Sequence, residues 1–296
     1  MIKITNLNKD YKNNRGLFGI DLEITKGEAV GFVGINGAGK TTTIRHIMGF
    51  LKPDSGSVTV DGKDSWSQSE KVRDLIGYIP GEIAFPNYHT GTEFLKQQSK
   101  LQGISNMERA NKVMKKLQLD PTANLKRMSK GMKQKTAIVA ALMAEKEILI
   151  LDEPTTGLDP LMRRRFIEMM LEEKRNGKTI FMSSHMFEEV EQICDRVALI
   201  ENGKIVAIKS VKEIKHNTNK KFTIIFKDRD SYVNFTKLNY IFNFTDDNKM
   251  LCTISVLNKD ISLFMKDLSA VQIKTISEEK YSLSQYFKDL EKEQND

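Results

Sequence analysis

The chain of 296 residues carries a net charge of +7, and 40% of its residues are hydrophobic and 29% charged. This length suits two domains, and this composition is typical of a soluble globular protein. No apolar run approaches the roughly 18 residues that cross a bilayer, and the strand-like start at Ile2 argues against a signal peptide. We therefore expect a cytoplasmic chain that cannot form a membrane pore. The modest charge indicates a solubility feature, so no nucleic-acid partner is expected, and Cys194 and Cys252, which lack metal-ligand spacing, are expected to be free thiols.

Short strands separated by turns are predicted near the N-terminus, at residues 2–7, 19–24 and 56–60. They are expected to form an antiparallel edge layer. Between them, Gly34–Thr41 matches the phosphate-loop pattern Gly-x4-Gly-Lys-Thr, with a predicted strand at Ala29–Val33 before it and a predicted helix over residues 41–50 after it.

Each fixed position of that loop pattern has a physical role in binding a nucleoside triphosphate. Glycines let backbone N–H groups surround the β-phosphate, and the helix N-terminus adds partial positive charge. Lys40 can reach the β- and γ-phosphates, and the Thr41 hydroxyl can bind Mg²⁺. The predicted nucleotide-binding residues of the loop are Gly34, Asn36, Gly37, Ala38, Gly39, Lys40, Thr41 and Thr42.

Helical patterns dominate from Glu93 to about Lys146, after a capping box at Thr90–Glu93 and with a break at Pro121. Apolar runs then predict two buried parallel strands, at residues 148–151 and 179–182. Asn202–Gly203 predicts a hairpin turn between two further strands. The basic run Arg163–Arg165 is interpreted as the solvated face of a helix.

The composition changes at residues 216–221, a polar stretch that is interpreted as a linker between domains 1–215 and 216–296. Seven elements are predicted beyond it, at residues 222–226, 231–238, 240–244, 250–256, 260–269, 271–276 and 282–292. Their βαββαβ order with one added helix predicts a small ferredoxin-like α+β domain. One face of the helix from Asp260 is expected to pack on the sheet through Ile261, Phe264, Met265 and Leu268. This domain carries no catalytic motif.

Two carboxylates, Asp152 and Glu153, directly follow the apolar run Ile148–Leu151. They should lie at the carboxyl end of that strand, beside the phosphate loop, where open α/β sheets bind ligands. Asp152 is predicted to hold Mg²⁺, directly or through water. Glu153 is placed to act as general base on the attacking water, a role worth about 10²–10⁴-fold in rate. An apolar run that ends in Asp-Glu is weak evidence for a nucleotide site by itself, and it becomes strong evidence when the chain also carries a phosphate loop.

With these motifs the chain resembles the nucleotide-binding subunit of an ATP-binding cassette (ABC) transporter, over residues 1 to about 210. The resemblance implies a phosphate-loop α/β core with an antiparallel β subdomain and a helical subdomain at about 82–135, and ATP with Mg²⁺ as its ligands. It implies that Tyr11 stacks on adenine. It also implies that the signature segment, which faces the ATP held by a partner subunit, consists of Ser129, Lys130, Gly131 and Met132. Ser129 is additionally predicted to be the N-cap of the following helix.

Two further segments match the family in order. Pro154–Asp159 resembles the loop that crosses the dimer interface, with Asp159 as its polar anchor. His185, after the predicted strand at 179–182, matches the histidine that contacts the γ-phosphate and orients water. Glu153 and His185 are therefore the predicted catalytic residues.

The chain departs from the family pattern at two places. After Tyr78–Pro80 the family carries glutamine, whereas this chain has Gly81 and then Glu82, which becomes a further candidate for the Mg²⁺ or water contact. The signature segment has Lys130 and Met132 where the family has glycine and glutamine. Lys130 adds positive charge where a phosphate would lie, so nucleotide binding is still expected.

The resemblance implies an ATPase that works as a homodimer or heterodimer and drives a separate transmembrane permease at the inner face of the cell membrane. The tail resembles that of ATPases from bacterial drug, antibiotic-resistance and peptide exporters, through the closing pattern Ser282–Phe287. Export of drugs, antimicrobial peptides or other amphipathic compounds is therefore expected. The alternatives are an importer subunit, a soluble ABC ATPase outside transport, and a binding module that has lost hydrolysis. A GTP switch is disfavoured because Asn258–Ile261 lacks the final aspartate of a guanine-reading motif.

Overall fold

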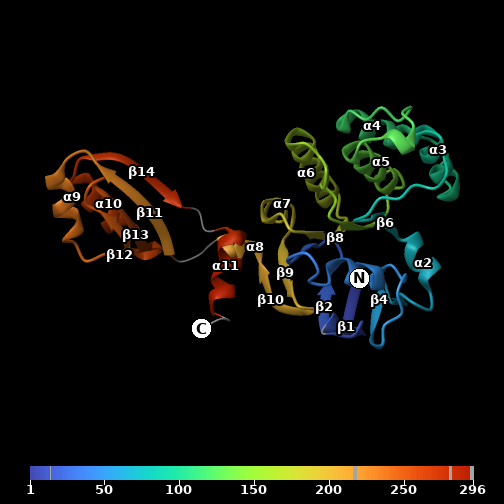
Figure 1. Cartoon of the computed structure of the whole chain (residues 1–296), viewed down its shortest axis with the longest axis horizontal. Helices are drawn as coiled ribbons and strands as arrows, with labels where there is room; N and C mark the ends of the chain where they lie inside the picture. The colour runs from blue at the N-terminus through green and yellow to red at the C-terminus, as the bar shows by residue number, and fades with distance from the viewer. Residues whose placement is uncertain (14, 216–218, 280–281, 294–296) are drawn as a thin grey trace. The chain divides into compact units, whose positions relative to one another are not determined.

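The computed structural model describes residues 1–13, 15–215, 219–279 and 282–293 (Figure 1). The chain divides into two compact units, Met1–Ser210 and Val211–Asp296. The boundary lies after Ser210 rather than after residue 215. Within the predicted linker, residues 216–218 lie outside the described residues, and the chain is already in a strand from Asn219.

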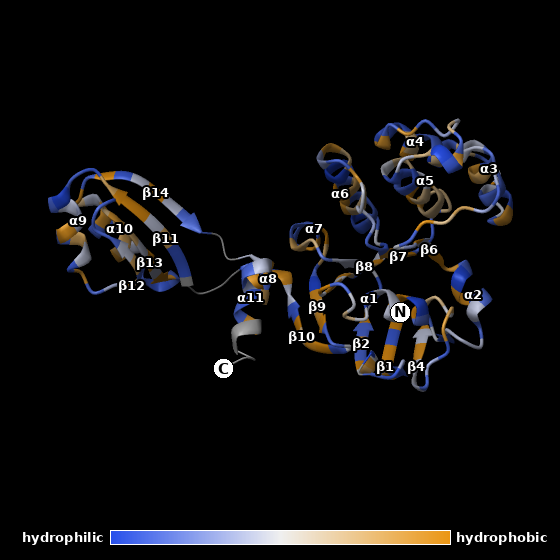
Figure 2. Ribbon diagram, in the orientation of Figure 1, coloured by the Kyte–Doolittle hydropathy of each residue, from blue (hydrophilic) through white to orange (hydrophobic). Residues whose placement is uncertain are grey.

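The first unit contains an antiparallel sheet in the order β2-β1-β4-β5. Its strands are β1 (Ile2–Asp10), β2 (Gly16–Ile24), β4 (Ser55–Val60) and β5 (Lys63–Asp64). Buried residues alternate with exposed ones along β1 and β2, and Figure 2 shows both apolar and polar residues along β1 and β4. The predicted edge layer is thus confirmed, with β1 and β2 longer than expected.

The central sheet of the same unit has the order β10-β9-β3-β8-β7-β6. Its strands are β3 (Ala29–Val33), β6 (Ile76–Ile79), β7 (Ile148–Asp152), β8 (Thr179–Ser184), β9 (Arg196–Glu201) and β10 (Lys204–Ser210). Strands β9, β3, β8, β7 and β6 run parallel, and β10 returns antiparallel through the predicted turn at Asn202–Gly203. Every residue of β3, β7 and β8 is buried, which explains their continuous apolar runs.

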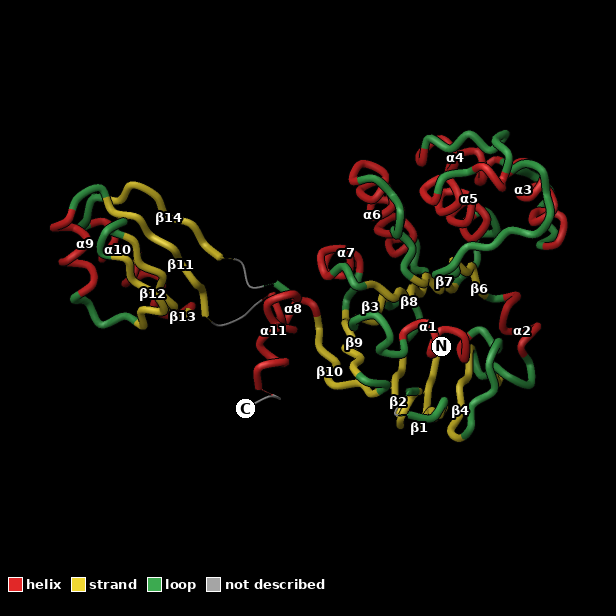
Figure 3. Tube along the Cα trace, in the orientation of Figure 1, coloured by secondary structure: helices red, strands yellow, loops and turns green. Residues whose placement is uncertain are grey.

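Helices of the first unit fall into two groups. Those that follow strands of the central or edge sheet are α1 (Lys40–Ile47), α2 (Ser69–Asp74), α6 (Pro160–Arg175) and α7 (Phe187–Ile193). The other group, α3 (Gly91–Leu101), α4 (Glu108–Leu117), η1 (Leu125–Arg127) and α5 (Lys130–Leu142), lies together as a helical subdomain (Figure 3). The predicted capping box is half right: the Thr90 side chain accepts from the Glu93 N–H, but the Glu93 carboxylate accepts from the N–H of His89.

The second unit has the predicted βαββαβ order, preceded by α8 (Val211–Lys215) and followed by α11 (Leu283–Glu293). The elements between are β11 (Asn219–Phe226), α9 (Arg229–Thr236), β12 (Ile241–Asp246), β13 (Leu251–Leu257), η2 (Asn258–Asp260), α10 (Ile261–Ser269) and β14 (Ile273–Glu279). The sheet order β12-β13-β11-β14 is antiparallel throughout, and Phe226, Phe235 and Phe264 fill its core. The expectation for Met265 was wrong: it is 48% exposed, because α10 buries mainly Phe264 and Leu268.

Across the ranges that the structure describes, none of the helices combines the length and the apolar character needed to span a bilayer.

Candidate nucleotide site

The phosphate loop lies between β3 and α1, as the sequence predicts. Gly39, the residue before α1, has a φ of 113°, and a Cβ on it would lie 2.7 Å from Leu17, so only glycine fits there. Lys40 is 6% exposed, and its Nζ donates to the carbonyl oxygens of Gly34 at 2.7 Å and Ile35 at 3.2 Å. The loop therefore forms a closed turn with its cation inside. Thr41 and Thr42 follow in the first turn of α1, partly exposed.

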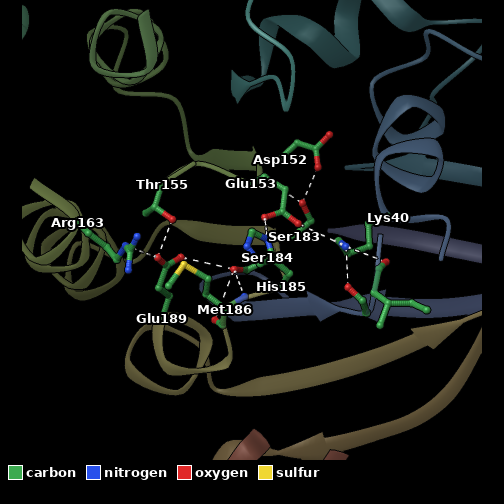
Figure 4. A network of polar contacts seen from close by, with 12 residues as sticks. Lys40, Asp152, Glu153, Thr155, Arg163, Ser183, Ser184, His185, Met186 and Glu189 are labelled. Carbon is green, nitrogen blue, oxygen red and sulfur yellow. Dashed lines mark hydrogen bonds and ion pairs between the residues drawn. The ribbon is translucent and has the colours of Figure 1, made fainter. Parts of the chain in front are cut away.

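The parallel sheet brings the two predicted catalytic residues to this lysine. Glu153 follows β7, and its Oε1 lies 3.4 Å from Lys40 Nζ. His185 follows β8, and its Nδ1 lies 2.6 Å from Oε2 of Glu153 (Figure 4). Residues far apart in the sequence thus form a continuous polar row from Lys40 through Glu153 to His185.

The backbone of Glu153 adopts a left-handed conformation, with a φ of 48°. Such a conformation costs a non-glycine residue roughly 1–3 kcal/mol and persists only where its surroundings hold it. Here the Glu153 N–H donates to the carbonyl oxygen of Ser183 at 3.2 Å and to its hydroxyl at 3.0 Å. Glu153 Oε1 is buried and has no hydrogen-bond partner among the described residues. This oxygen is the one left to accept a proton.

Asp152 is fully buried at the end of β7. Its Oδ1 accepts a 2.5 Å hydrogen bond from the Ser183 hydroxyl, whereas Oδ2 has no hydrogen-bond partner within the described part of the chain. Gly81 leaves space beside it, since a Cβ at that position would lie 2.9 Å from Oδ2. An unpaired, buried carboxylate oxygen suits a hard cation such as Mg²⁺, which prefers oxygen ligands. Asp152 and Thr41 are therefore residues that could hold it.

A third carboxylate, Glu189 of α7, lies next to this row and is 1% exposed. Its Oε1 accepts a 2.6 Å hydrogen bond from the Thr155 hydroxyl and lies 3.3 Å from Nε of Arg163. Its Oε2 lies 3.5 Å from the Ser184 hydroxyl. The pKa of Glu189 lies above its usual value, because burial raises it by more than the hydrogen bond from Thr155 and the charge of Arg163 lower it.

The predicted signature segment lies at the start of α5. Ser129 is the N-cap, as predicted, and its hydroxyl accepts from the Met132 N–H at 3.2 Å. Lys130 is exposed, and Gly131 lies so close to Gly157 that a Cβ on it would lie 2.7 Å from the Gly157 carbonyl oxygen. The hydrogen bonds of Ser129 stay within α5, so the structure does not bring this segment together with the phosphate loop of its own chain.

Three other predicted site residues lie outside the polar row. Tyr11 follows β1, is 50% exposed, and has Lys9 Nζ 5.9 Å from its ring centroid. Asp159 is exposed and acts as the N-cap of α6, with its side chain accepting from Met162 N–H at 2.9 Å. Glu82 is exposed and makes no hydrogen bond or ion pair with another described residue.

Sequence reasoning missed Ser183, Ser184 and Glu189, and it misjudged Arg163. The arginine was expected on a solvated face, but it pairs with the buried Glu189 from the first turn of α6. The only available signal for the serines was their place directly after the predicted strand at 179–182. Nothing in the local sequence marked Glu189 among its neighbours Glu188 and Glu191.

A phosphate loop between a parallel strand and a helix, with carboxylates at the ends of neighbouring strands, defines a P-loop nucleoside triphosphatase. The ABC transporter family model matches residues 17–156. The linearmycin resistance ATP-binding protein LnrL of Bacillus subtilis is 38% identical over 213 residues, which are 70% of this chain and 68% of that protein. The bacitracin transport ATP-binding protein BcrA of Bacillus licheniformis is 34% identical over 238 residues, which are 79% of this chain and 77% of that protein.

Solved structures agree with these similarities. An ATP-binding subunit of an ABC transporter superposes with a TM-score of 0.67 at 31% identity, and the match covers 73% of this chain and 92% of the other. A dimeric ATP-binding cassette in a post-hydrolysis state, bound to ADP and Pi, has a TM-score of 0.65 at 22% identity over 71% of this chain and 99% of the other, which supports the fold. The chain belongs to the ABC transporter family, as an ATP-binding subunit with ATPase activity.

The contact between Gly81 and Asp152 predicts a cost for Gly81→Ala. The new methyl group would meet a buried carboxylate that Ser183 holds in place, so we expect the free energy of unfolding to fall by about 1–3 kcal/mol. Denaturant unfolding measures this loss. The matched control is Glu82→Gln on the exposed neighbouring residue, which should leave stability unchanged. Equal stability of Gly81→Ala and the parent chain would contradict the predicted crowding.

Proposed function

We propose that this ATPase subunit drives a separate membrane permease, with ATP hydrolysed between two subunits. The observation that carries the proposal is the polar row in which Glu153 lies between Lys40 and His185. Lys40 and the backbone of the phosphate loop bind the phosphates, and Tyr11 stacks on the base. Asp152 and Thr41 would hold Mg²⁺, which would supply positive charge to the reacting phosphates.

In this proposal Glu153 is the general base. Its Oε2 is held by His185, which fixes the carboxylate in one orientation, and its buried Oε1 is free of hydrogen bonds within the described chain. A water that attacks the γ-phosphate would give its proton to Oε1. Lys40, 3.4 Å from Oε1, stabilises negative charge on the phosphate side of the same position.

The signature segment requires a second subunit. Ser129–Met132 lie at the N-terminus of α5, where partial positive charge favours a phosphate, but they do not contact the phosphate loop of their own chain. We propose that they cover the ATP bound by a partner subunit, and that Lys130 adds its charge there. Loss of the γ-phosphate would then remove the attraction between subunits and open the dimer.

Similarity to the linearmycin resistance and bacitracin transport proteins supports export of an amphipathic antimicrobial compound. The closing Ser282–Phe287 pattern, part of which forms α11, supports the same direction. In this proposal the subunit lies at the cytoplasmic face of the cell membrane, bound to its permease through the helical subdomain.

Glu153→Gln tests the base. The amide keeps the shape of the side chain but cannot accept a proton, so ATP turnover of the purified chain should fall by about 10²–10⁴-fold. ATP-dependent dimerisation, measured by size-exclusion chromatography with light scattering, should persist. Turnover close to that of the parent chain would reject Glu153 as the base.

Lys40→Ala tests nucleotide binding separately from chemistry. ATP that binds only the folded chain raises its unfolding temperature, and this increase should disappear in the variant. The control is Arg45→Ala, an exposed cation on the same helix α1, which should keep the increase. An undiminished effect of ATP on Lys40→Ala would contradict the assigned role.

Ser129→Asp tests the predicted two-subunit site. Aspartate is also a good N-cap, so α5 should stay intact, but its negative charge would repel the phosphates of the partner's ATP. We expect the variant to keep the thermal stabilisation by ATP and to lose ATP-dependent dimerisation. A variant that dimerises at the same ATP concentration as the parent chain would contradict the placement of Ser129 at that interface.

A further inference from the structure

Three consecutive residues at the end of β8 each contact a different acidic side chain. Ser183 donates to Asp152, Ser184 lies by Glu189, and His185 contacts Glu153 (Figure 4). Asp152 and Glu153 belong to the proposed metal and catalytic positions, but Glu189 has no role there. It is nevertheless a buried carboxylate, and burying such a group is costly unless it is paired and hydrogen-bonded.

Glu189 joins three separate elements through its two oxygens. Oε1 accepts the 2.6 Å hydrogen bond of Thr155, from the loop after β7, and pairs at 3.3 Å with Arg163 of α6. Oε2 lies 3.5 Å from the hydroxyl of Ser184, which itself accepts from the Met186 N–H at 2.9 Å. The carboxylate thus connects the loop after β7, the loop after β8 and the start of α6.

Both hydroxyls stand next to the proposed catalytic pair in the sequence. Thr155 is separated from Glu153 by Pro154 alone, and Ser184 directly precedes His185. The carbonyl of Pro154 is also fixed, since it accepts a 2.7 Å bond from the buried Gln134 of α5. The position of Glu153 relative to His185 therefore depends on how far apart Thr155 and Ser184 are held.

We infer that Glu189 is a positioning residue for hydrolysis, which holds Thr155 and Ser184 so that Glu153 and His185 stay at 2.6 Å. The inference rests on the proposed role of Glu153. It requires a carboxylate rather than an amide: Oε1 accepts from Thr155, Oε2 lies by Ser184, and the negative charge offsets that of Arg163, whereas glutamine offers one oxygen and no charge. No hydrogen bond or ion pair joins Glu189 to Lys40 or to the phosphate loop within the described residues, so ATP binding should not depend on it.

The test is Glu189→Gln in the full chain, assayed for kcat, KM for ATP and thermal stabilisation by ATP. A misplaced catalytic group costs up to about a hundredfold in rate, so kcat should fall about ten- to hundredfold while KM changes less than about twofold. Stabilisation by ATP should persist. The matched control is Glu188→Gln, an exposed glutamate on the same helix, which should behave like the parent chain.

A second pair of variants covers the case in which Glu189→Gln does not fold. Thr155→Val removes the hydroxyl at nearly constant volume and should lower kcat, whereas Thr155→Ser keeps the hydroxyl and should restore kcat to within about twofold of the parent. Unchanged kcat in Glu189→Gln or in Thr155→Val overturns the inference. So does a variant that loses thermal stabilisation by ATP together with kcat. A kcat of Thr155→Ser as low as that of Thr155→Val overturns it as well. Glu153→Gln in the same assay separates the two proposals: if it is inactive while Glu189→Gln is normal, only the positioning role fails.

Discussion

The parallel pairing of β3, β8 and β7 is the constraint on which the site depends. In that register Val33 pairs with Ser184, and Ser183 pairs with Asp152, so three strands end at one edge of the sheet. The polar residues of the site directly follow these strands: the phosphate loop follows β3, Glu153 follows β7 and His185 follows β8. Because every residue of these strands is buried, a slip of the register would force tightly packed side chains on both faces of the sheet to repack, and the polar row of Lys40, Glu153 and His185 keeps its geometry.

Three carboxylates gather at this edge of the sheet, and their negative charges need hydrogen-bond or cationic partners. Asp152, Glu153 and Glu189 are all mostly or fully removed from solvent, and each has its own partner: the Ser183 hydroxyl, Lys40 with His185, and Thr155 with Arg163. Buried carboxylates without such partners would be strongly destabilising. The division of partners also leaves two oxygens without a hydrogen bond within the described chain, Asp152 Oδ2 and Glu153 Oε1, which are the atoms best suited to a cation and to a proton.

The remainder of the molecule is built from separate hydrophobic clusters. One lies within the first unit, between the edge sheet, α1 and the central strands, and another lies within the second unit, around Phe226, Phe235 and Phe264. The second unit therefore has what an independent domain needs, a four-stranded sheet with helices α9 and α10 packed on it and its own core. Within the first unit, Gln134 ties α5, the helix that begins with the signature segment, to Pro154 in the loop after β7.

The sequence by itself determined the phosphate loop, the edge layer, the parallel strands, the hairpin at Asn202–Gly203 and the βαββαβ order, since each follows from local periodicity or turn chemistry. It also marked Lys40, Asp152, Glu153 and His185, because each stands at a strand end or helix start. Only the tertiary structure decided which side chains meet: that Arg163 turns to Glu189, that Gly81 leaves space at Asp152, and that Met265 faces solvent. Such contacts join residues far apart in the chain, and their strength comes from burial, which local sequence does not encode.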